Sequence, residues 1–164
     1  MKIAICDDDN SFLQNVKFLI NKIYSNPDKL SIYEYESGEQ FLLQFKPQLY
    51  DVIILDIEMC GITGLEVAEE IRKIDKSVIL AFFTSHQEFA TLGYEVNAFR
   101  YILKNQPEHM FINQLKSIFD EYHQSHITFP VQASSEVVNV LVSDILYFEI
   151  FKRTVVLHTI KKKY

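Results

Sequence analysis

Five short strand-like segments alternate with helical segments over residues 1–122, and this alternation constrains the fold more than any other feature. Residues 2–6, 51–55 and 78–83 are mostly continuous apolar runs, which are typical of strands buried on both faces. Residues 30–35 alternate as a strand does, and residues 98–103 form the fifth segment. The pattern predicts an α/β fold, in which a doubly wound, five-stranded parallel sheet carries helices on both faces.

The segments between these strands have the signatures of helices. Ser11 is followed by apolar residues at helical spacing, and the same spacing recurs after Glu108. Ser37 and Gln40 form the Ser-x-x-Gln pattern of a capping box, which marks the start of a helix. Gly93 is expected to end a short fourth helix. The sequence therefore predicts helices over 11–24, over 37–45, from 65 onward, over 87–94 and over 108–122.

Beyond about residue 125 the pattern changes to strands alone. The strand-like segments there are 127–132, 137–142, 145–150 and 154–159, joined by short polar groups. Residues 1–120 carry 11 Lys and Arg against 18 Asp and Glu, whereas residues 121–164 carry 5 against 4. We therefore expect a first domain over 1–122, a linker over 123–126 and a short all-β segment over 127–164.

Several classes of protein do not fit the sequence. No apolar run approaches the roughly 18 residues of a membrane helix, and the N-terminus lacks the apolar stretch of a signal peptide. Cys6 and Cys60 lack the spacing of a metal-binding motif, and Cys6 lies in an apolar run that suits a small buried side chain. The three lysines at 161–163 do not by themselves indicate nucleic-acid binding. We expect a cytoplasmic protein without a membrane partner.

Polar side chains follow four of the predicted strands at the point where each strand ends. Asp7 and Asp8 follow the first strand, Asp56 the third, Thr84 the fourth and Lys104 the fifth. Ligands of open parallel sheets bind at this carboxyl edge, so we expect these side chains to lie together. Each residue alone has an ordinary interpretation as a helix cap, a turn or a solvated side chain. Their occurrence at successive strand ends favours a shared site.

The chemistry of these side chains points to phosphoryl transfer. Three converging carboxylates repel one another and are usually balanced by a cation, and hard oxygen ligands favour Mg²⁺ or the similar Mn²⁺. Lys104 and Thr84 would hold phosphoryl oxygens. The set suits attack by the Asp56 carboxylate on a phosphoryl group. We expect a phosphoryl acceptor with self-catalysed transfer, not a turnover enzyme.

Four stretches carry a resemblance to a known family. They are Ile-Ala-Ile-Cys-Asp-Asp at 3–8, Val-Ile-Ile-Leu-Asp at 52–56, Phe-Phe-Thr-Ser at 82–85 and Phe-Arg-Tyr-Ile-Leu-Lys at 99–104, with glycines at 61 and 64. In these stretches the first 122 residues resemble the receiver domain of two-component response regulators, which has a flavodoxin-like or CheY-like fold. The resemblance implies that a sensor histidine kinase is the phosphoryl donor and that phosphorylation controls an output.

The resemblance also implies a role for each matching acidic residue. Asp7, Asp8 and Asp56 would bind the metal ion together with the backbone carbonyl of Glu58. Asp56 would take the phosphoryl group. Asp9 is not expected to be a ligand, because the acidic pair of the family follows the strand directly.

Thr84 and Tyr101 would form the switch of such a domain. Thr84 would be drawn to the phosphoryl group, and the Tyr101 ring would move inward. One position departs from the family pattern, because Asn105 stands where the lysine is usually followed by a proline, often in a cis peptide. A cis bond before a non-proline residue costs about 2.5–4 kcal/mol, so we expect a trans Lys104–Asn105 peptide.

Two further polar residues lie close to the expected site. Glu58 and His86 stand two residues after Asp56 and Thr84, where side chains could flank the path of an attacking water. One hypothesis is that they tune the lifetime of the phosphorylated state. The other is that both are solvated loop residues.

The C-terminal segment carries a second resemblance. Val-Ser-Asp-Ile-Leu-Tyr-Phe-Glu at 142–149, followed by Lys152 and Arg153, is similar to the start of the LytTR-type DNA-binding domain of AgrA-like transcription regulators. Residues 127–164 would form a partial domain of 38 residues, below the roughly 40 at which isolated domains usually need outside support. The resemblance implies promoter DNA as a partner of intact relatives, and a homodimer is a further expected assembly.

Two alternatives stay open at this point. The chain could be a receiver that acts through protein contacts without binding DNA, and the salt dependence of DNA binding would separate the two. A haloacid-dehalogenase-like phosphatase also uses an aspartate nucleophile after a strand, with Mg²⁺. That family has a second aspartate two residues later, where this chain has Glu58.

Overall fold

A parallel sheet forms the centre of the first of two compact units. The computed structural model describes residues 1–133, 136–152 and 154–164, which separate into Met1–Asp120 and Glu121–Tyr164. The strands of the first unit are β1 Lys2–Cys6, β2 Ser31–Tyr35, β3 Val52–Leu55, β4 Ile79–Thr84 and β5 Arg100–Leu103. All pairs are parallel, in the order β2-β1-β3-β4-β5. The predicted five-stranded α/β fold is therefore confirmed.

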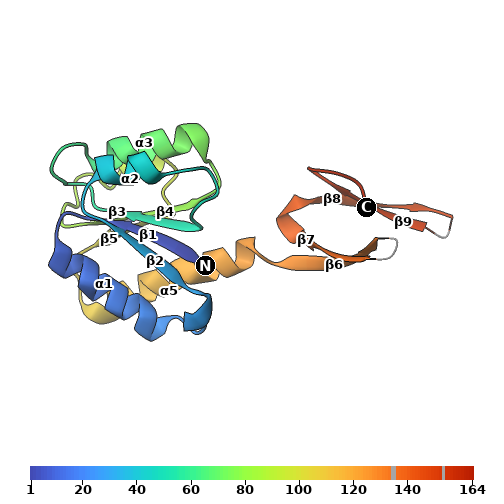
Figure 1. Cartoon of the computed structure of the whole chain (residues 1–164), viewed down its shortest axis with the longest axis horizontal. Coiled ribbons are helices and arrows are strands. Elements are labelled where there is room, and N and C mark those ends of the chain that lie inside the picture. The colour runs from blue at the N-terminus through green and yellow to red at the C-terminus, as the bar shows by residue number, and fades with distance from the viewer. Residues whose placement is uncertain (134–135, 153) are drawn as a thin grey trace. The chain divides into compact units, whose positions relative to one another are not determined.

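Helices cover both faces of this sheet (Figure 1). α1 Asn10–Ile23 and α5 Glu108–Ser125 lie on one face, and α2 Gly38–Gln44 and α3 Gly64–Ile74 lie on the other. Successive side chains of a strand point to opposite faces. Phe82 accordingly joins the core cluster of α2 and α3, whereas Phe83 contacts Phe12 and Phe111 with ring centroids 6.2 and 4.9 Å apart. Burial on both faces explains why β1, β3 and β4 are continuous apolar runs.

The fourth helix differs from the prediction. The helix expected over 87–94, with Gly93 at its end, is the single turn α4 Leu92–Glu95, and Gly93 lies inside it. The residues before α4 form turns, in which the Ala90 N–H donates to the Gln87 carbonyl at 3.2 Å. Hydrogen bonds to the third residue back form tighter turns than those of an α-helix and seldom continue for long. The predicted helix is therefore wrong in its extent.

The side chain of Arg72, on α3, caps the C-terminal end of this short helix. Carbonyls at the C-terminal end of a helix have no partner within the helix, and a guanidinium group offers five N–H donors. The Arg72 side chain is half-buried and donates to four backbone carbonyls, two of them directly after α4. It thereby ties α4 to the end of α3 and the start of β4. The acceptors are Val96 at 2.7 Å, Asn97 at 3.1 Å, Val78 at 2.9 Å and Asp75 at 3.3 Å.

Gly64 allows α3 to begin directly against the backbone that follows β3. A Cβ atom at Gly64 would lie 1.8 Å from the carbonyl oxygen of Asp56. We expect Gly64→Ala to lower the free energy of unfolding by about 2–3 kcal/mol, because α3 must move away from that backbone. Urea unfolding followed by circular dichroism measures the change.

Gly93→Ala is the control for this substitution. A Cβ atom at Gly93 would meet its nearest neighbour at 3.6 Å, which is an ordinary contact. Alanine should raise the free energy of unfolding by up to about 1 kcal/mol through its higher helix propensity. Equal effects of the two alanines would show that the contact between Gly64 and Asp56 is not the cause.

The second unit consists of two antiparallel hairpins. β6 Thr128–Ala133 pairs with β7 Glu136–Leu141, and β8 Ile145–Phe151 pairs with β9 Thr154–Thr159. The four expected strands are thus present. Arg153, which belongs to the LytTR-like stretch, lies outside the described residues, as do residues 134 and 135. Phe129 of β6 contacts Phe148 of β8, with ring centroids 5.9 Å apart.

Strand β8 leaves large apolar side chains in solvent. Ile150 is 76% exposed and Phe151 is 64% exposed. Apolar surfaces of this kind are usually covered by another element or another chain.

α5 continues to Ser125 and so crosses the division between the two units at residue 120. The domain limits of 122 and 126 stay predictions. Among the described residues, no helix combines the length and the apolar character that crossing a membrane requires.

Candidate functional site

The expected site residues continue the hydrogen-bond ladder of the sheet by one residue beyond the strands. The Asp56 N–H donates to the Cys6 carbonyl of β1 at 2.8 Å, and the Lys104 N–H donates to the Thr84 carbonyl of β4 at 2.9 Å. The Asp7 N–H donates to the carbonyl at the end of β2 at 3.0 Å. These bonds bring the residues directly after β1, β3 and β5 to one edge of the sheet, together with Thr84 at the end of β4, as the strand pattern predicts.

Three carboxylates form a cluster at this edge. One oxygen each of Asp7, Asp8 and Asp56 lies within 4.8 Å of the others. Asp7 is 1% exposed and Asp56 is 7% exposed, whereas Asp8 is open to solvent. An oxygen-only donor set, partly buried and open on one side, fits a hard divalent cation such as Mg²⁺. The cluster can therefore hold a metal ion.

Lys104 partly neutralises the cluster. Its Nζ lies 2.5 Å from Asp7 Oδ2 and 2.7 Å from Asp56 Oδ2, and it also stands 4.4 Å from the centre of the Phe12 ring. Burial alone would lower the pKa of Lys104, but its hydrogen bonds to Asp56 and Asp7 outweigh burial and raise the pKa. The ammonium group is therefore charged at neutral pH. The Lys104–Asn105 peptide is trans, as predicted.

The remaining carboxylate oxygens have backbone partners. Asp56 Oδ1 accepts from the Ile57 N–H at 2.7 Å, which fixes the orientation of the carboxylate. Asp7 Oδ1 accepts from the Asp9 N–H at 2.9 Å, and burial raises the pKa of Asp7 against the opposing effect of the lysine. Asp9 caps α1 by accepting from the Ser11 N–H at 2.9 Å. Asp9 thus serves the helix, and the acidic cluster does not include it.

Thr84 and Tyr101 lie beside the cluster on β4 and β5. Thr84 is fully buried, and its Oγ1 accepts from the His86 N–H at 3.2 Å. The Tyr101 hydroxyl donates to the His86 carbonyl. The Tyr101 ring packs on Phe82 with centroids 6.2 Å apart. The two residues of the expected switch are therefore linked through the backbone of His86, two residues after the end of β4.

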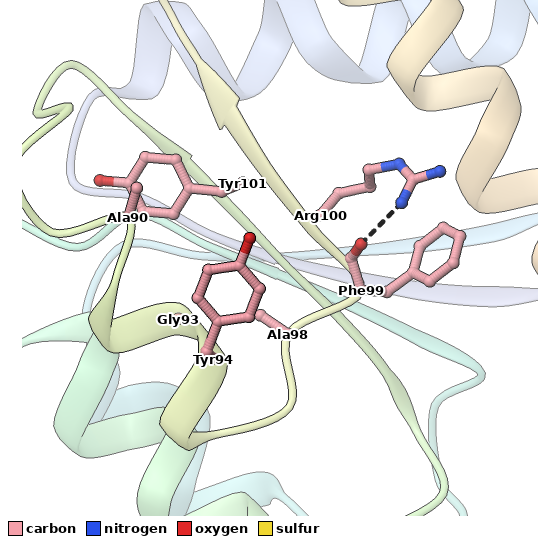
Figure 2. A pocket seen from close by; sticks show the side chains of 7 residues that line it. All are labelled: Ala90, Gly93, Tyr94, Ala98, Phe99, Arg100 and Tyr101. Carbon is pink, nitrogen blue, oxygen red and sulfur yellow. Dashed lines mark hydrogen bonds between the residues drawn. The ribbon is translucent and has the colours of Figure 1, made fainter.

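A small cavity lies on the outer side of Tyr101 (Figure 2). Its volume is about 270 Å³, and the Tyr101 and Tyr94 rings form part of its wall. Tyr94 projects from α4 and is 81% exposed. A movement of the Tyr101 ring would therefore change this surface. The lining residues are Ala90, Gly93, Tyr94, Ala98, Phe99, Arg100 and Tyr101.

Glu58 and His86, two separate candidates in the sequence, form one ion pair. His86 Nε2 lies 2.8 Å from Glu58 Oε2, and His86 Nδ1 lies 3.0 Å from Glu88 Oε1. The hydrogen bond to Glu88 raises the pKa of His86, and the charge of Glu58 adds to the effect. Glu88 was not expected in the site. Residues two apart do not face each other on a helix, and the sequence predicts a helix from residue 87, so the pairing with His86 follows only from the turn after β4.

A model of one protein family matches this region. The model described as the response regulator receiver domain matches residues 3–116. The chain belongs to the response regulator receiver family. The predicted receiver domain and its CheY-like fold are thereby confirmed for the first unit. Receivers of this family are not classical enzymes.

Among curated proteins, the chain is similar to sensory transduction proteins of Staphylococcus and Oceanobacillus. It is 34% identical over 104 residues to "Sensory transduction protein LytR" of Staphylococcus epidermidis, a match that covers 63% of this chain and 40% of that protein. It is 32% identical over 111 residues to "Sensory transduction protein LytT" of Oceanobacillus iheyensis, covering 66% and 44%. The chain thus spans less than half the length of these relatives.

Solved receiver structures are similar as well. The response regulatory domain of protein mrkE from Klebsiella pneumoniae has a TM-score of 0.65 and 29% identity, covering 76% of this chain and 99% of that one. The response regulator protein TrrA from Thermotoga maritima, solved in complex with Mg²⁺ and BeF, has a TM-score of 0.59 and 28% identity, covering 71% and 97%.

Proposed function

We propose that this receiver accepts a phosphoryl group on Asp56 from a sensor histidine kinase, with Mg²⁺ or Mn²⁺ bound at Asp7, Asp8 and Asp56. The observation that carries the proposal is the Lys104 ammonium group, which bridges two buried carboxylates at 2.5 and 2.7 Å beside a third, exposed one. The negative charge of the three carboxylates exceeds the positive charge of the lysine by about as much as one divalent cation would neutralise. The Mg²⁺ complex of TrrA is consistent with this assignment.

The transfer step requires little more than positioning and charge. A carboxylate oxygen of Asp56 forms a bond to phosphorus while the bond from phosphorus to the leaving group breaks, and the leaving group departs with the electron pair. The Ile57 N–H holds Asp56 Oδ1 and so orients the nucleophile. Lys104 would turn from the carboxylate to a phosphoryl oxygen. The metal ion, held also by the Glu58 backbone carbonyl, would neutralise the developing charge.

Thr84 and Tyr101 would transmit the change. The Thr84 hydroxyl would move to donate to a phosphoryl oxygen, and this movement would displace the His86 backbone, whose N–H donates to Thr84 and whose carbonyl accepts from Tyr101. The Tyr101 hydroxyl would then lose its hydrogen bond to the His86 carbonyl, and its ring would be free to turn from the cavity of about 270 Å³ toward the core. The surface formed by α4 and β5 would change as a result.

The output of the intact protein would be transcription. The LytTR-like stretch at 142–149 supports promoter DNA as the partner, and a Staphylococcus aureus relative is named "Transcriptional regulatory protein LytR". A receiver that acts through protein contacts is the alternative. Affinity for DNA that falls steeply with salt would favour the DNA-binding output, since released counterions accompany phosphate contacts. We expect the protein to act in the cytoplasm.

Exposure to acetyl phosphate tests the central claim. With Mg²⁺, one acid-stable and hydroxylamine-labile phosphoryl group should appear and map to the peptide that contains Asp56. Removal of the metal with EDTA should abolish the labelling, because three carboxylates would then face the incoming phosphoryl group with a single lysine. Labelling that persists in EDTA, or that maps to a serine or histidine, would refute the proposal.

The Glu58–His86 pair provides a second prediction. If the pair restricts the approach of water to the phosphorylated aspartate, Glu58→Ala and His86→Ala should each speed dephosphorylation by about threefold to tenfold. The double variant should be no faster than either single one, because the two side chains act as one unit. Glu69→Ala, which removes an exposed carboxylate of α3 outside the pair, is the control. Unchanged rates in both single variants would favour the interpretation as solvated loop residues.

A further inference from the structure

The loop between β3 and α3 is held from two sides. The Cys60 N–H donates to Asp8 Oδ2 at 3.0 Å, and the Ile62 N–H donates to Glu39 Oε1 at 2.9 Å. Asp8 belongs to the acidic cluster, whereas Glu39 lies in the first turn of α2, outside the cluster. The same loop carries Glu58, whose backbone carbonyl is a proposed ligand of the metal ion. The position of that carbonyl therefore depends on what holds the loop.

Two glycines bring α2 and the loop into close contact. A Cβ atom at Gly61 would lie 2.2 Å from Glu39 Oε1, and Gly61 has a φ of 91°, which glycine adopts without steric cost. A Cβ atom at Gly38 would lie 2.7 Å from Ile62 Cγ1. The Glu39 carboxylate thus rests directly on the backbone of residues 61 and 62. The contact requires glycine on both sides, at position 38 in α2 and at position 61 in the loop.

The Glu39 carboxylate is an ionised acceptor in this contact. Its own N–H and the Ile62 N–H lower the pKa of Glu39, and the Ser37 side chain contributes a further hydrogen bond. Charged acceptors form stronger hydrogen bonds than neutral ones. Asp8, by contrast, must share its carboxylate between the Cys60 N–H and any cation bound in the cluster. The hydrogen bond between the Glu39 carboxylate and the loop does not compete with metal binding.

We propose that Glu39 is a positioning residue, which fixes the β3–α3 loop and thereby sets the affinity of the acidic cluster for a divalent cation. The inference rests on the proposed function, since it concerns the same metal site. Glu39 would contact neither the cation nor the phosphoryl group. It acts through the Ile62 N–H on the backbone that carries the Glu58 carbonyl.

Calorimetric titration of the full, unphosphorylated chain with Mg²⁺ alone tests the proposal. Glu39→Ala should weaken Mg²⁺ binding by about threefold to tenfold, because a hydrogen bond to a charged acceptor is lost. Glu39→Gln keeps an acceptor oxygen for the Ile62 N–H and should bind Mg²⁺ within about twofold of the unaltered chain. Glu36→Ala is the control for charge, since it removes a neighbouring exposed carboxylate whose side chain bonds Asn10 and not the loop.

Hydrogen exchange of the Ile62 amide supplies a second readout in the absence of metal. The amide should exchange faster in Glu39→Ala than in the unaltered chain and in Glu39→Gln. Equal Mg²⁺ affinity of Glu39→Ala and the unaltered chain would overturn the proposal, as would an equal loss in Glu39→Gln or Glu36→Ala. The titration requires no phosphoryl transfer. A chain that binds Mg²⁺ as expected but takes no label from acetyl phosphate would refute the proposed function and leave the role of Glu39 intact.

Discussion

Asp56→Asn is expected to abolish phosphoryl labelling by acetyl phosphate, because the amide nitrogen that replaces one oxygen is not a nucleophile. Asparagine has the shape of aspartate and keeps an oxygen that can accept from the Ile57 N–H, as Asp56 Oδ1 does at 2.7 Å. Lys104 keeps its second partner, Asp7, at 2.5 Å. The free energy of unfolding should therefore change by no more than about 1 kcal/mol. Intact-mass spectrometry and urea unfolding measure the two effects on the same sample.

Asp51→Asn is the matched control. Asp51 directly precedes β3 and Asp56 directly follows it, so the two aspartates flank the same strand at opposite ends of the sheet. Asp51 Oδ2 accepts from the Lys2 N–H at 2.7 Å and has no part in the acidic cluster. The Asp51→Asn variant should label as the unaltered chain does. Full labelling of Asp56→Asn would contradict the assignment of the phosphoryl acceptor.

Lys104→Ala is expected to affect both stability and phosphoryl transfer. The lysine side chain is 15% exposed and pairs with two carboxylates that are 2% and 9% exposed. Loss of one partner of a buried ion pair typically lowers the free energy of unfolding by about 3–5 kcal/mol. Because this site is open to solvent on one side, we expect a loss of about 2–4 kcal/mol without Mg²⁺. The rate of labelling should fall by about 10²–10³, the usual effect of removing one charge-stabilising group.

The stability deficit of Lys104→Ala should depend on pH. Burial already raises the pKa of Asp7, and removal of the lysine raises it further. An acid with a raised pKa in the folded state stabilises that state at low pH and loses this effect as the pH rises through the folded pKa. The deficit should therefore shrink as the pH falls through the folded pKa of Asp7. In the unaltered chain, Lys104 itself has a raised pKa, so its contribution is complete at neutral pH and is lost only in strong alkali.

Lys116→Ala controls for the loss of a positive charge from the same unit. Lys116 lies on α5 and is exposed, so its removal should leave labelling unchanged and stability within about 0.5 kcal/mol. A Lys104→Ala variant that labels at the rate of Lys116→Ala would exclude Lys104 from the transfer step.

The corrections to the predicted fold have a common cause. The sequence pattern places Gly93 at a helix end because glycine interrupts helices, but in the fold Gly93 is inside α4, and Arg72 closes that helix from α3. The helix was predicted over 87–94, but the residues after β4 form a turn, and His86 lies there between Glu58 and Glu88. Arg72 and Glu58 contact segments that are distant in the chain, and the His86–Glu88 contact, which spans two residues, lies in an irregular turn. A helical period of 3.6 residues predicts none of these contacts.

What the sequence alone determined is the set of residues at the carboxyl edge of the sheet. Parallel strands end at one edge, so a buried apolar run followed by Asp7, Asp56 or Lys104 predicts their meeting without any knowledge of loops. What only the tertiary structure decided is how they and their neighbours pair. Lys104 reaches Asp56 across 48 residues and Glu39 reaches Ile62 across 23. Such pairs depend on loop conformation and on close backbone approach at glycines, which residue periodicity does not encode.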